Sequence, residues 1–219
     1  MIAKFVLVGV IGYLLGSIPF GVIVARRMAK VDVRSWGSGK MGTTNVLRTA
    51  GGKAAALVFA LDLSKGAAAV LLAGVVFGRG YLEIGDFTWG VLVAQVIAAL
   101  AAMAGHCRSV FLKFRGGGRG VATFFGGLAV LCPPAALFGG EVFIIGTGLT
   151  KFVSLASISA VASTYAVLAP LTIFNRFPVE YLIYALIGTG FIIFMHRGNI
   201  RRLWSGSERR WGDRAKLRG

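Results

Sequence analysis

Acidic residues are the scarcest charged class in this 219-residue chain. Only 8 residues are aspartate or glutamate, against 24 lysines and arginines, and the formal net charge is +16. Charge of either sign is almost absent from the long apolar runs, and 56% of all residues are hydrophobic. Soluble domains rarely carry their apolar residues in such uninterrupted blocks, so the sequence excludes a soluble protein and predicts an integral membrane protein.

Cysteine is also scarce. The two cysteines, Cys107 and Cys132, lie far apart and form no disulfide framework. Neither lies in a metal-ligand spacing, so we expect no metal site and no cofactor.

The apolar blocks predict an all-α polytopic bundle of about seven transmembrane helices, because each approaches the length that crosses about 30 Å of hydrocarbon. The predicted spans are Ile2–Ala25, Ala54–Phe77, Phe87–Ala104, Gly120–Leu131, Ala135–Leu149, Phe152–Phe174 and Val179–Met195. The fourth and fifth are short, so they are either thin or tilted spans or one re-entrant pair covered by protein. The count is seven or five, and either odd number places the termini on opposite sides.

Lysine and arginine gather on one side of this arrangement. Residues 26–53, 107–119, 151 and 197–219 hold 20 of the 24 basic residues, whereas the acidic Glu83 and Asp86 fall on the other side. Cytoplasmic loops carry the excess of positive charge, so we expect an outside N-terminus and a cytoplasmic C-terminus. With no linker and no repeat, residues 1–219 are predicted to form one membrane-embedded domain, in which 197–219 is a basic cytoplasmic tail. Small-residue spacings such as Gly12-x-x-x-Gly16 and Gly188 near Gly190 predict close helix packing.

The first predicted cytoplasmic loop, Trp36–Arg48, reads Trp-Gly-Ser-Gly-Lys-Met-Gly-Thr-Thr-Asn-Val-Leu-Arg. Its three glycines allow tight turns that present backbone N–H groups to an anion. Ser38, Thr43, Thr44 and Asn45 add neutral donors, and Lys40 and Arg48 add charge. Such a concave cluster of donors suits a phosphate. The alternative is an ordinary polar loop made basic by its position.

An acid and a base lie at or inside the second span, as Asp62-Leu-Ser-Lys65. Residues at i and i+3 share a helix face, so each charge can reduce the other's burial cost. Ionisable residues inside a membrane are functional candidates by default, with a structural ion pair as the alternative.

A triple glycine follows the third span, in Phe114-Arg-Gly-Gly-Gly-Arg-Gly-Val-Ala-Thr123, after Gly105-His106. Arg115 and Arg119 bracket the glycines, and guanidinium groups bind phosphate oxygens bidentately. A flexible connector with cytoplasmic charges is the alternative.

The last span ends in His196-Arg-Gly-Asn-Ile-Arg-Arg-Leu203. His196 and His106 are the only histidines in the chain, and both end spans on the predicted cytoplasmic side. A histidine accepts and donates protons near neutral pH. An amphipathic interfacial histidine is the alternative.

Together these features predict an anion-handling site at the cytoplasmic face of the membrane. Walker loops, Gly-x-Ser-x-Gly elbows and the His-x-x-x-x-Asp pattern of the common acyl-CoA-using acyltransferases are absent from the sequence. A channel or transporter for a small phosphorylated anion is the main rival, although its ionisable groups are expected near the midplane. A lipid-binding scaffold is the second. Nucleic-acid binding is not expected, because the charge follows the topology.

In this order, the motifs resemble those of the bacterial acyl-phosphate:glycerol-3-phosphate acyltransferases (PlsY). The resemblance runs from Ser17-Ile-Pro-Phe-Gly21 to Gly206-Ser-Glu208 and includes Val153-Ser-Leu-Ala-Ser157. The departures from the family pattern are Lys40 for asparagine, Thr43 for alanine, Ser109 for proline, Gly198 for glutamate, and Arg115 and Arg119 for lysines, with one extra glycine between them.

The resemblance implies transfer of a fatty acyl group from acyl phosphate to a hydroxyl of glycerol 3-phosphate, giving lysophosphatidate and phosphate in phospholipid biosynthesis at the bacterial plasma membrane. It also implies membrane lipids and an upstream enzyme that makes acyl phosphate as partners. The implied catalytic residues are Ser38 and His196. The implied substrate-binding residues are Gly37, Gly39, Thr44, Asn45, Arg48, Lys65, His106, Arg115, Gly116, Gly117, Arg119, Ser154, Ser157 and Asn199.

Overall fold

The computed structural model describes residues 1–84 and 87–213, and most of these residues are helical. Two three-residue strands, β1 (Leu82–Ile84) and β2 (Phe87–Trp89), form an antiparallel hairpin. Two short 3-10 helices cover Val33–Ser35 and Val110–Leu112. The α-helices are α1 (Ile2–Ser17), α2 (Phe20–Ala29), α3 (Thr43–Ala50), α4 (Gly52–Phe77), α5 (Val91–Cys107), α6 (Val121–Leu131), α7 (Pro133–Thr150), α8 (Val153–Ile173), α9 (Val179–Met195) and α10 (Arg197–Trp204).

Several of these helices are long and apolar enough to cross a membrane. Among the described residues there are four such stretches, and a fifth if α9 and α10, which are bent by 58° relative to each other, count as one. The four are Ile2–Ala29, Gly52–Phe77, Val91–Leu112 and Val153–Ile173. The predicted all-helical membrane architecture is therefore confirmed at the level of four or five membrane-capable helices. At 11 residues, α6 is too short to cross alone.

Two of the predicted spans differ in detail from the structure. The first was predicted as one helix, but Ile18 and Pro19 separate α1 from α2, since proline lacks the N–H that a continuous helix requires. The third was predicted to be helical from Phe87, but residues 87–89 form β2, and α5 begins only after Gly90. A short apolar run does not distinguish a strand from a helix by its pattern alone. Asp86 and residues 214–219 of the predicted tail lie outside the described residues.

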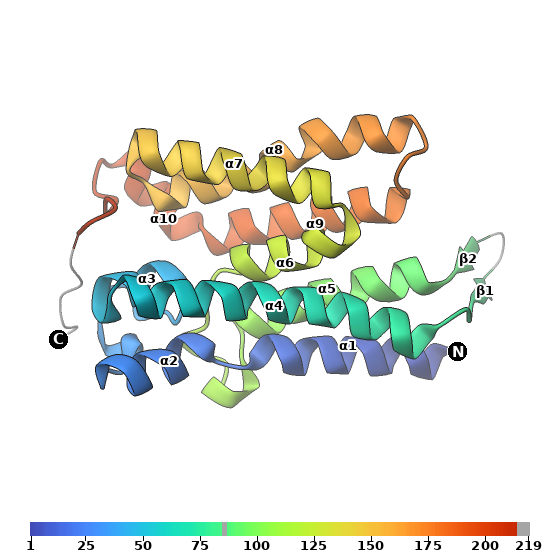
Figure 1. The fold of residues 1–219 in the computed structure, drawn as a ribbon, viewed down its shortest axis with the longest axis horizontal. Helices are drawn as coiled ribbons and strands as arrows, with labels where there is room; N and C mark the ends of the chain where they lie inside the picture. Colours follow the sequence, from blue (N-terminus) through green and yellow to red (C-terminus); the bar gives the residue numbers. More distant parts are fainter. Residues whose placement is uncertain (85–86, 214–219) are drawn as a thin grey trace.

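Figure 1 shows helices running lengthwise between the two ends of the molecule. The N-terminus and the β1–β2 hairpin lie at one end, and α2, α3 and α10 lie at the other. Basic segments from the first third and the last tenth of the chain therefore share one end of the bundle, as the distribution of lysine and arginine predicted.

Close approach of α1 to α5 depends on two glycines. A Cβ at Gly12 would collide with the carbonyl group of Ala98, and a Cβ at Gly16 with that of Ala102. Small residues let two membrane helices approach until their backbones touch, which maximises van der Waals contact. The packing role predicted for the Gly12-x-x-x-Gly16 spacing is confirmed.

The short helix α6 is held against α4 in the same way. A Cβ at Gly66 of α4 would collide with the carbonyl of Thr123, and a Cβ at Gly126 of α6 with the carbonyl of Leu63. Figure 1 shows α6 lying between α4 and α7. This contact places the N-terminus of α6 inside the bundle, toward the basic end.

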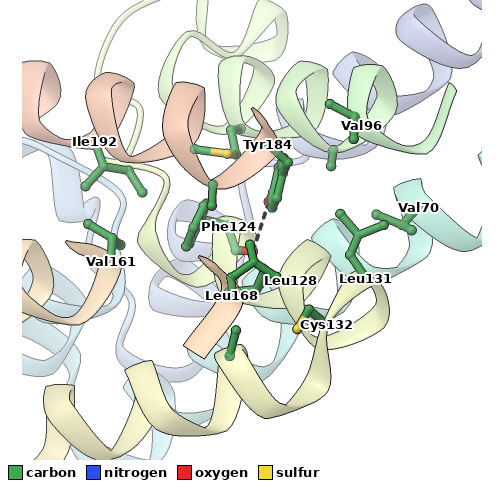
Figure 2. Close-up of a cluster of buried hydrophobic side chains, with 14 residues drawn as sticks. Val70, Val96, Phe124, Leu128, Leu131, Cys132, Val161, Leu168, Tyr184 and Ile192 are labelled. Carbon is green, nitrogen blue, oxygen red and sulfur yellow. Dashed lines mark hydrogen bonds between the residues drawn. The ribbon is translucent and has the colours of Figure 1, made fainter. Parts of the chain in front are cut away.

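The main hydrophobic core surrounds α6 (Figure 2). The ring of Phe124 stacks on that of Tyr184 of α9, with 5.2 Å between centroids. The Tyr184 hydroxyl donates a hydrogen bond to the Phe124 carbonyl at 2.9 Å, so the only polar atom of this buried side chain is satisfied. Leu128 and Leu168 complete the contact between α6 and α8.

Replacing Gly12 with alanine should destabilise the protein by about 1–3 kcal/mol, because the added methyl group forces α1 away from α5. Gly190→Ala is the matched control: Gly190 also lies inside a helix, but a Cβ there meets no other atom within 4 Å. Thermal unfolding in detergent, followed by reaction of a thiol-specific dye with the buried Cys107 and Cys132, measures the difference. Equal melting temperatures for the two variants would contradict the packing role.

Candidate active site

Asn45, in the first turn of α3, fixes the shape of the first glycine loop. Its side chain is buried, and its Oδ1 accepts a hydrogen bond from the backbone N–H of Ser38 at 3.2 Å. Gly37 and Gly39 have positive φ angles of 55° and 68°, which other residues rarely adopt. The Asn45 amide nitrogen donates to three carbonyls at 2.9–3.0 Å, those of Val33, Trp36 and Lys40.

The second glycine loop is fixed between the first loop and α5. The Met41 N–H donates to the Gly116 carbonyl at 2.9 Å, and the Gly118 N–H donates to the His106 carbonyl at 3.0 Å. A side chain at Gly118 would collide with the His106 ring, so only glycine fits there. The loop leads directly into α6 and carries Arg119 with it.

Behind these loops lies a buried ion pair. Lys65 Nζ is 2.8 Å from Asp62 Oδ1, and His106 Nδ1 is 3.4 Å from the same oxygen. Lys65 Nζ also donates to the carbonyl of Ile18 at 3.2 Å. The i, i+3 pairing predicted from the sequence is confirmed. The burial of Lys65 in this pair favours a structural ion pair over a role in substrate binding.

A cavity of about 1000 Å³ lies where the two loops meet the helices. Its walls come from all of the helices α3 to α10 and from the two glycine loops. One part is lined by polar and charged groups. The other is lined by apolar side chains, among them Ala55, Ala56, Phe59, Val121, Phe143, Ile144 and Val153. A smaller cavity of about 180 Å³ lies between the two glycine loops and shares Ser38, Lys40, Met195 and Arg197 with the large one.

Cations dominate the polar part of the large cavity. Seven lysines and arginines line it, against two carboxylates. Each carboxylate is already paired, Asp62 with Lys65 and Glu208 with Arg202. The remaining positive charge is available for an anion that enters the cavity.

Arg119 is the most deeply placed of these cations. Burial lowers its pKa to about 10, so it stays charged at neutral pH. Its Nε is buried and has no hydrogen-bond partner within the described part of the chain. Burial and the neighbouring Arg119 charge also lower the pKa of Lys40. A buried donor without a partner costs free energy, and an anionic ligand would supply the missing acceptor.

His196 lies at the bend between α9 and α10, immediately after the α9 span, and lines the large cavity. Its Nδ1 is 2.8 Å from the carbonyl oxygen of Ile192. A carbonyl only accepts hydrogen bonds, so Nδ1 carries the proton and Nε2 is the free acceptor. Burial and the charge of Arg119 lower the pKa of His196 to about 4, which keeps the ring neutral at pH 7.

Glu208 organises the polar wall opposite the glycine loops. Its carboxylate accepts hydrogen bonds from Ser154 Oγ at 2.9 Å, Asn199 Nδ2 at 2.6 Å and Arg202 Nε at 2.7 Å. Burial opposes ionisation of Glu208, but these three donors hold its pKa below the ordinary value. The carboxylate therefore joins α8, α10 and the segment that follows α10.

That segment, residues 205–213, closes one side of the cavity. The Trp211 N–H donates to the Lys151 carbonyl at 2.6 Å, and Arg48 Nη2 donates to the Arg210 carbonyl at 3.0 Å. Trp211 lines the cavity. The described part of the predicted basic tail is thus a wall of the site.

The structure brings most of the predicted site residues together. The large cavity is lined by Gly37, Ser38, Thr44, Asn45, Arg48, His106, Arg119, Ser154, Ser157, His196 and Asn199. The smaller one is lined by Gly39, Gly116 and Gly117, with Ser38 again. Two residues are not brought to either cavity: Lys65 is buried in its ion pair, and Arg115 is exposed to solvent.

Sequence reasoning missed several residues that line the site, namely Arg197, Arg201, Arg202, Glu208 and Arg209. Lys40 and Asp62, which it singled out as a charge of the first loop and as an intramembrane candidate, do line the cavity. Helical spacing could have identified one of the missed residues, because Arg202 lies three residues after Asn199 on the same face of α10. Glu208 carries no such signal, since it follows the end of the helix and reaches its partners only through the folded tail.

The fold and the site together define a class: an integral membrane protein whose helical bundle holds, at one end, a cationic cavity continuous with apolar walls. The model of the family described as "Glycerol-3-phosphate acyltransferase" matches residues 6–206. Glycerol-3-phosphate acyltransferase 3 of Dehalococcoides mccartyi (strain CBDB1) is 57% identical over 99% of this chain and 100% of its own length. The chain therefore belongs to the glycerol-3-phosphate acyltransferase family and is an acyltransferase.

More distant relatives agree with this. The glycerol-3-phosphate acyltransferase of Synechococcus sp. (strain JA-2-3B'a(2-13)) is 44% identical over 93% of this chain and 92% of its own length. Crystal structures of PlsY (YgiH), an integral membrane glycerol 3-phosphate acyltransferase, match in fold. The glycerol 3-phosphate form has a TM-score of 0.80 at 37% identity, covering 95% of this chain and 96% of its own. The form described with lysophosphatidic acid has a TM-score of 0.78 at 35% identity, covering 95% of each chain.

Asn45→Asp should disrupt the site without changing side-chain size. The substitution removes both N–H donors of the amide and places a carboxylate against the three carbonyls, which costs about 2 kcal/mol or more at roughly 1 kcal/mol per lost hydrogen bond. We expect a lower melting temperature and a large loss of acyltransferase turnover. Asn175→Asp, at an exposed residue in a left-handed turn that aspartate also tolerates, is the control. If both variants keep the melting temperature and turnover of the unsubstituted protein, Asn45 does not hold the loop.

Proposed function

We propose that this acyltransferase uses acyl phosphate as its donor and releases lysophosphatidate and inorganic phosphate. The observation that carries the proposal is the continuity of one cavity from a cationic end, with buried Arg119, to apolar walls. A donor with a phosphate head and a hydrocarbon tail fits both parts at once. Glycerol 3-phosphate needs only the cationic end. An acyl phosphate donor is also consistent with the family.

In this proposal the phosphate groups lie against Lys40 of the first glycine loop, Arg48 of α3 and Arg119 of the second glycine loop. Arg48 Nη2 donates to the Arg209 and Arg210 carbonyls, and the other guanidinium N–H groups remain free, because guanidinium carries five donors. Gly37 and Gly116, which have positive φ angles, present backbone N–H groups, and such groups bind phosphate well. The acyl tail lies along the apolar walls formed by α4, α6 and α7.

The chemical step is attack of a glycerol 3-phosphate hydroxyl on the acyl carbonyl carbon. A new carbon–oxygen ester bond forms, and the bond between the carbonyl carbon and the phosphate oxygen breaks, with phosphate leaving. Either His196 Nε2 or a substrate phosphate oxygen accepts the hydroxyl proton. The Nδ1–H bond to Ile192 supports the first, because it leaves Nε2 as the acceptor. Ser38 and the nearby cations stabilise the oxyanion that develops on the carbonyl.

The other implied residues have supporting roles in this proposal. Asn45 shapes the first loop, and His106 supports the second through its contact with Gly118. Ser154 and Asn199 hold Glu208, and Thr44 and Ser157 complete the polar wall. Gly37, Gly116 and Gly117 provide backbone N–H groups, whereas the Gly39 N–H donates to the Trp36 carbonyl at 2.9 Å and shapes the first loop. Lys65 and Arg115 are given no part in substrate binding, because neither reaches a cavity.

We further propose that the chain forms one domain with seven spans, in which α1 and α2 make the first span and α6 and α7 cross with support from their neighbours. The N-terminus is then outside and the site lies at the cytoplasmic face of the plasma membrane, in line with the positive charge there. Glycerol 3-phosphate reaches the site from the cytoplasm, and an upstream enzyme supplies the acyl phosphate.

Purified protein in lipid vesicles tests the activity. Given hexadecanoyl phosphate and glycerol 3-phosphate, it should release phosphate and form lysophosphatidate only when both are present. His196→Ala should lower kcat by about 10²–10⁴-fold if the imidazole is the base, since proton transfer in general is worth this much.

Several outcomes count against the proposal. Uptake of radiolabelled glycerol 3-phosphate into the vesicles without turnover would support the rival transporter. Full turnover by His196→Ala, at an unchanged melting temperature, would leave the substrate phosphate as the only proton acceptor in the proposed step.

Cysteine labelling of intact cells tests the orientation. Arg79→Cys and Ser205→Cys place thiols at exposed residues at opposite ends of the bundle, while Cys107 and Cys132 are buried. A membrane-impermeant maleimide should label Arg79→Cys in intact cells and Ser205→Cys only after permeabilisation. The reverse pattern would place the site on the outer face of the membrane, where cytoplasmic glycerol 3-phosphate cannot reach it, and would contradict the proposed orientation.

A further inference from the structure

Two adjacent glycines of α7, Gly139 and Gly140, face different surroundings. A Cβ at Gly139 would collide with the Phe125 ring of α6 and approach the Ala160 carbonyl of α8, so helix packing explains this glycine. A Cβ at Gly140 meets no other atom within 4 Å, so packing does not explain it. Gly140 instead lines the large cavity.

Gly140 lies at the far end of the apolar part of that cavity. The α7 residues that line it are Gly140, Phe143, Ile144 and Thr147. With a rise of 1.5 Å per residue, Gly140 is about 10 Å farther along α7 than Thr147, away from the polar end. Gly140 is therefore the deepest α7 residue that lines the cavity.

The apolar part of the cavity opens sideways about one turn of α7 before Gly140, counted from the polar end. Its walls are α4 and α7, which both pack on α6 but do not form an extensive contact with each other. Phe59 of α4 and Ile144 of α7 line the cavity and are still 45% and 70% exposed. Side chains that line a cavity and also face outward mark a lateral opening, here on the apolar surface that membrane lipid covers.

We infer that Gly140 leaves the end of this groove open, so that the tail of a long acyl donor passes between α4 and α7 into the hydrocarbon of the membrane. The inference rests on the proposed function and adds a specificity-determining position to it. The unsubstituted enzyme then sets no upper limit on the length of the acyl chain of its donor. A larger side chain at position 140 closes the groove and sets an upper limit on chain length.

Gly140→Leu tests this directly. Turnover is measured in lipid vesicles with octanoyl phosphate and with hexadecanoyl phosphate, each with glycerol 3-phosphate. We expect kcat/KM for hexadecanoyl phosphate to fall about tenfold or more relative to that for octanoyl phosphate. A pocket that is too short by a few methylene groups disfavours the longer substrate by this much. Gly140→Ala should give a smaller change in the same direction.

Gly148→Leu is the matched control. Gly148 lies two turns farther along the same helix, is exposed, also has no atom within 4 Å of an added Cβ, and does not line either cavity. Leucine has a higher helix propensity than glycine, so neither substitution should impair folding of α7. The ratio of the two donors should be the same for Gly148→Leu and the unsubstituted protein.

The outcomes separate this inference from the proposed function. If the unsubstituted protein turns over both donors and Gly140→Leu and Gly140→Ala leave their ratio unchanged, or lower both equally, the inference is wrong and the function stands. If Gly148→Leu shifts the ratio as much as Gly140→Leu, the effect is not due to the groove and the inference is again wrong. If the unsubstituted protein turns over neither donor, the proposed acyl phosphate chemistry itself fails, and the inference with it.

Discussion

The close backbone contact between α4 and α6 is the constraint on which the site depends. Gly66 and Gly126 allow it, because a Cβ at either residue would collide with the opposite backbone. With α6 held on α4, this short helix forms the floor between α4 and α7 and keeps those two helices apart. The same contact fixes the start of α6, so the loop before it delivers Arg119 into the cavity. One packing interaction thus sets both the apolar groove and its charged end.

The pairing of charges around the site decides which cations are left for a substrate. An unpaired charge in a low-dielectric interior is costly, so buried charges are found with partners. Asp62 is paired with Lys65, and Glu208 is paired with Arg202. Arg119 has no such partner in the described chain. The arrangement is complete only when an anion is present, which is what an enzyme with phosphorylated substrates requires.

The sequence predicted those features that depend on local patterns. Apolar length predicted the helices, and spacing within a helix predicted the Gly12 contact and the Asp62–Lys65 pair. It could not separate Arg115 from Arg119, since both bracket the same glycines and differ only in where the folded loop directs them. It also misassigned residues 87–89, where an apolar run next to a glycine suits a strand as well as a helix. These failures lie where tertiary contacts, and not local propensity, decide the structure.

Glu208 shows why the resemblance alone could not assign each residue a role. Ser154 and Asn199 are implied to bind substrate, yet both donate to the Glu208 carboxylate. The single O–H of Ser154 is then already used, and Asn199 keeps one N–H. Because Arg202 is also bound to this carboxylate, the phosphate groups must find most of their donors elsewhere. The remaining cations come from separate segments of the chain, so they form a phosphate site only after the whole bundle has folded.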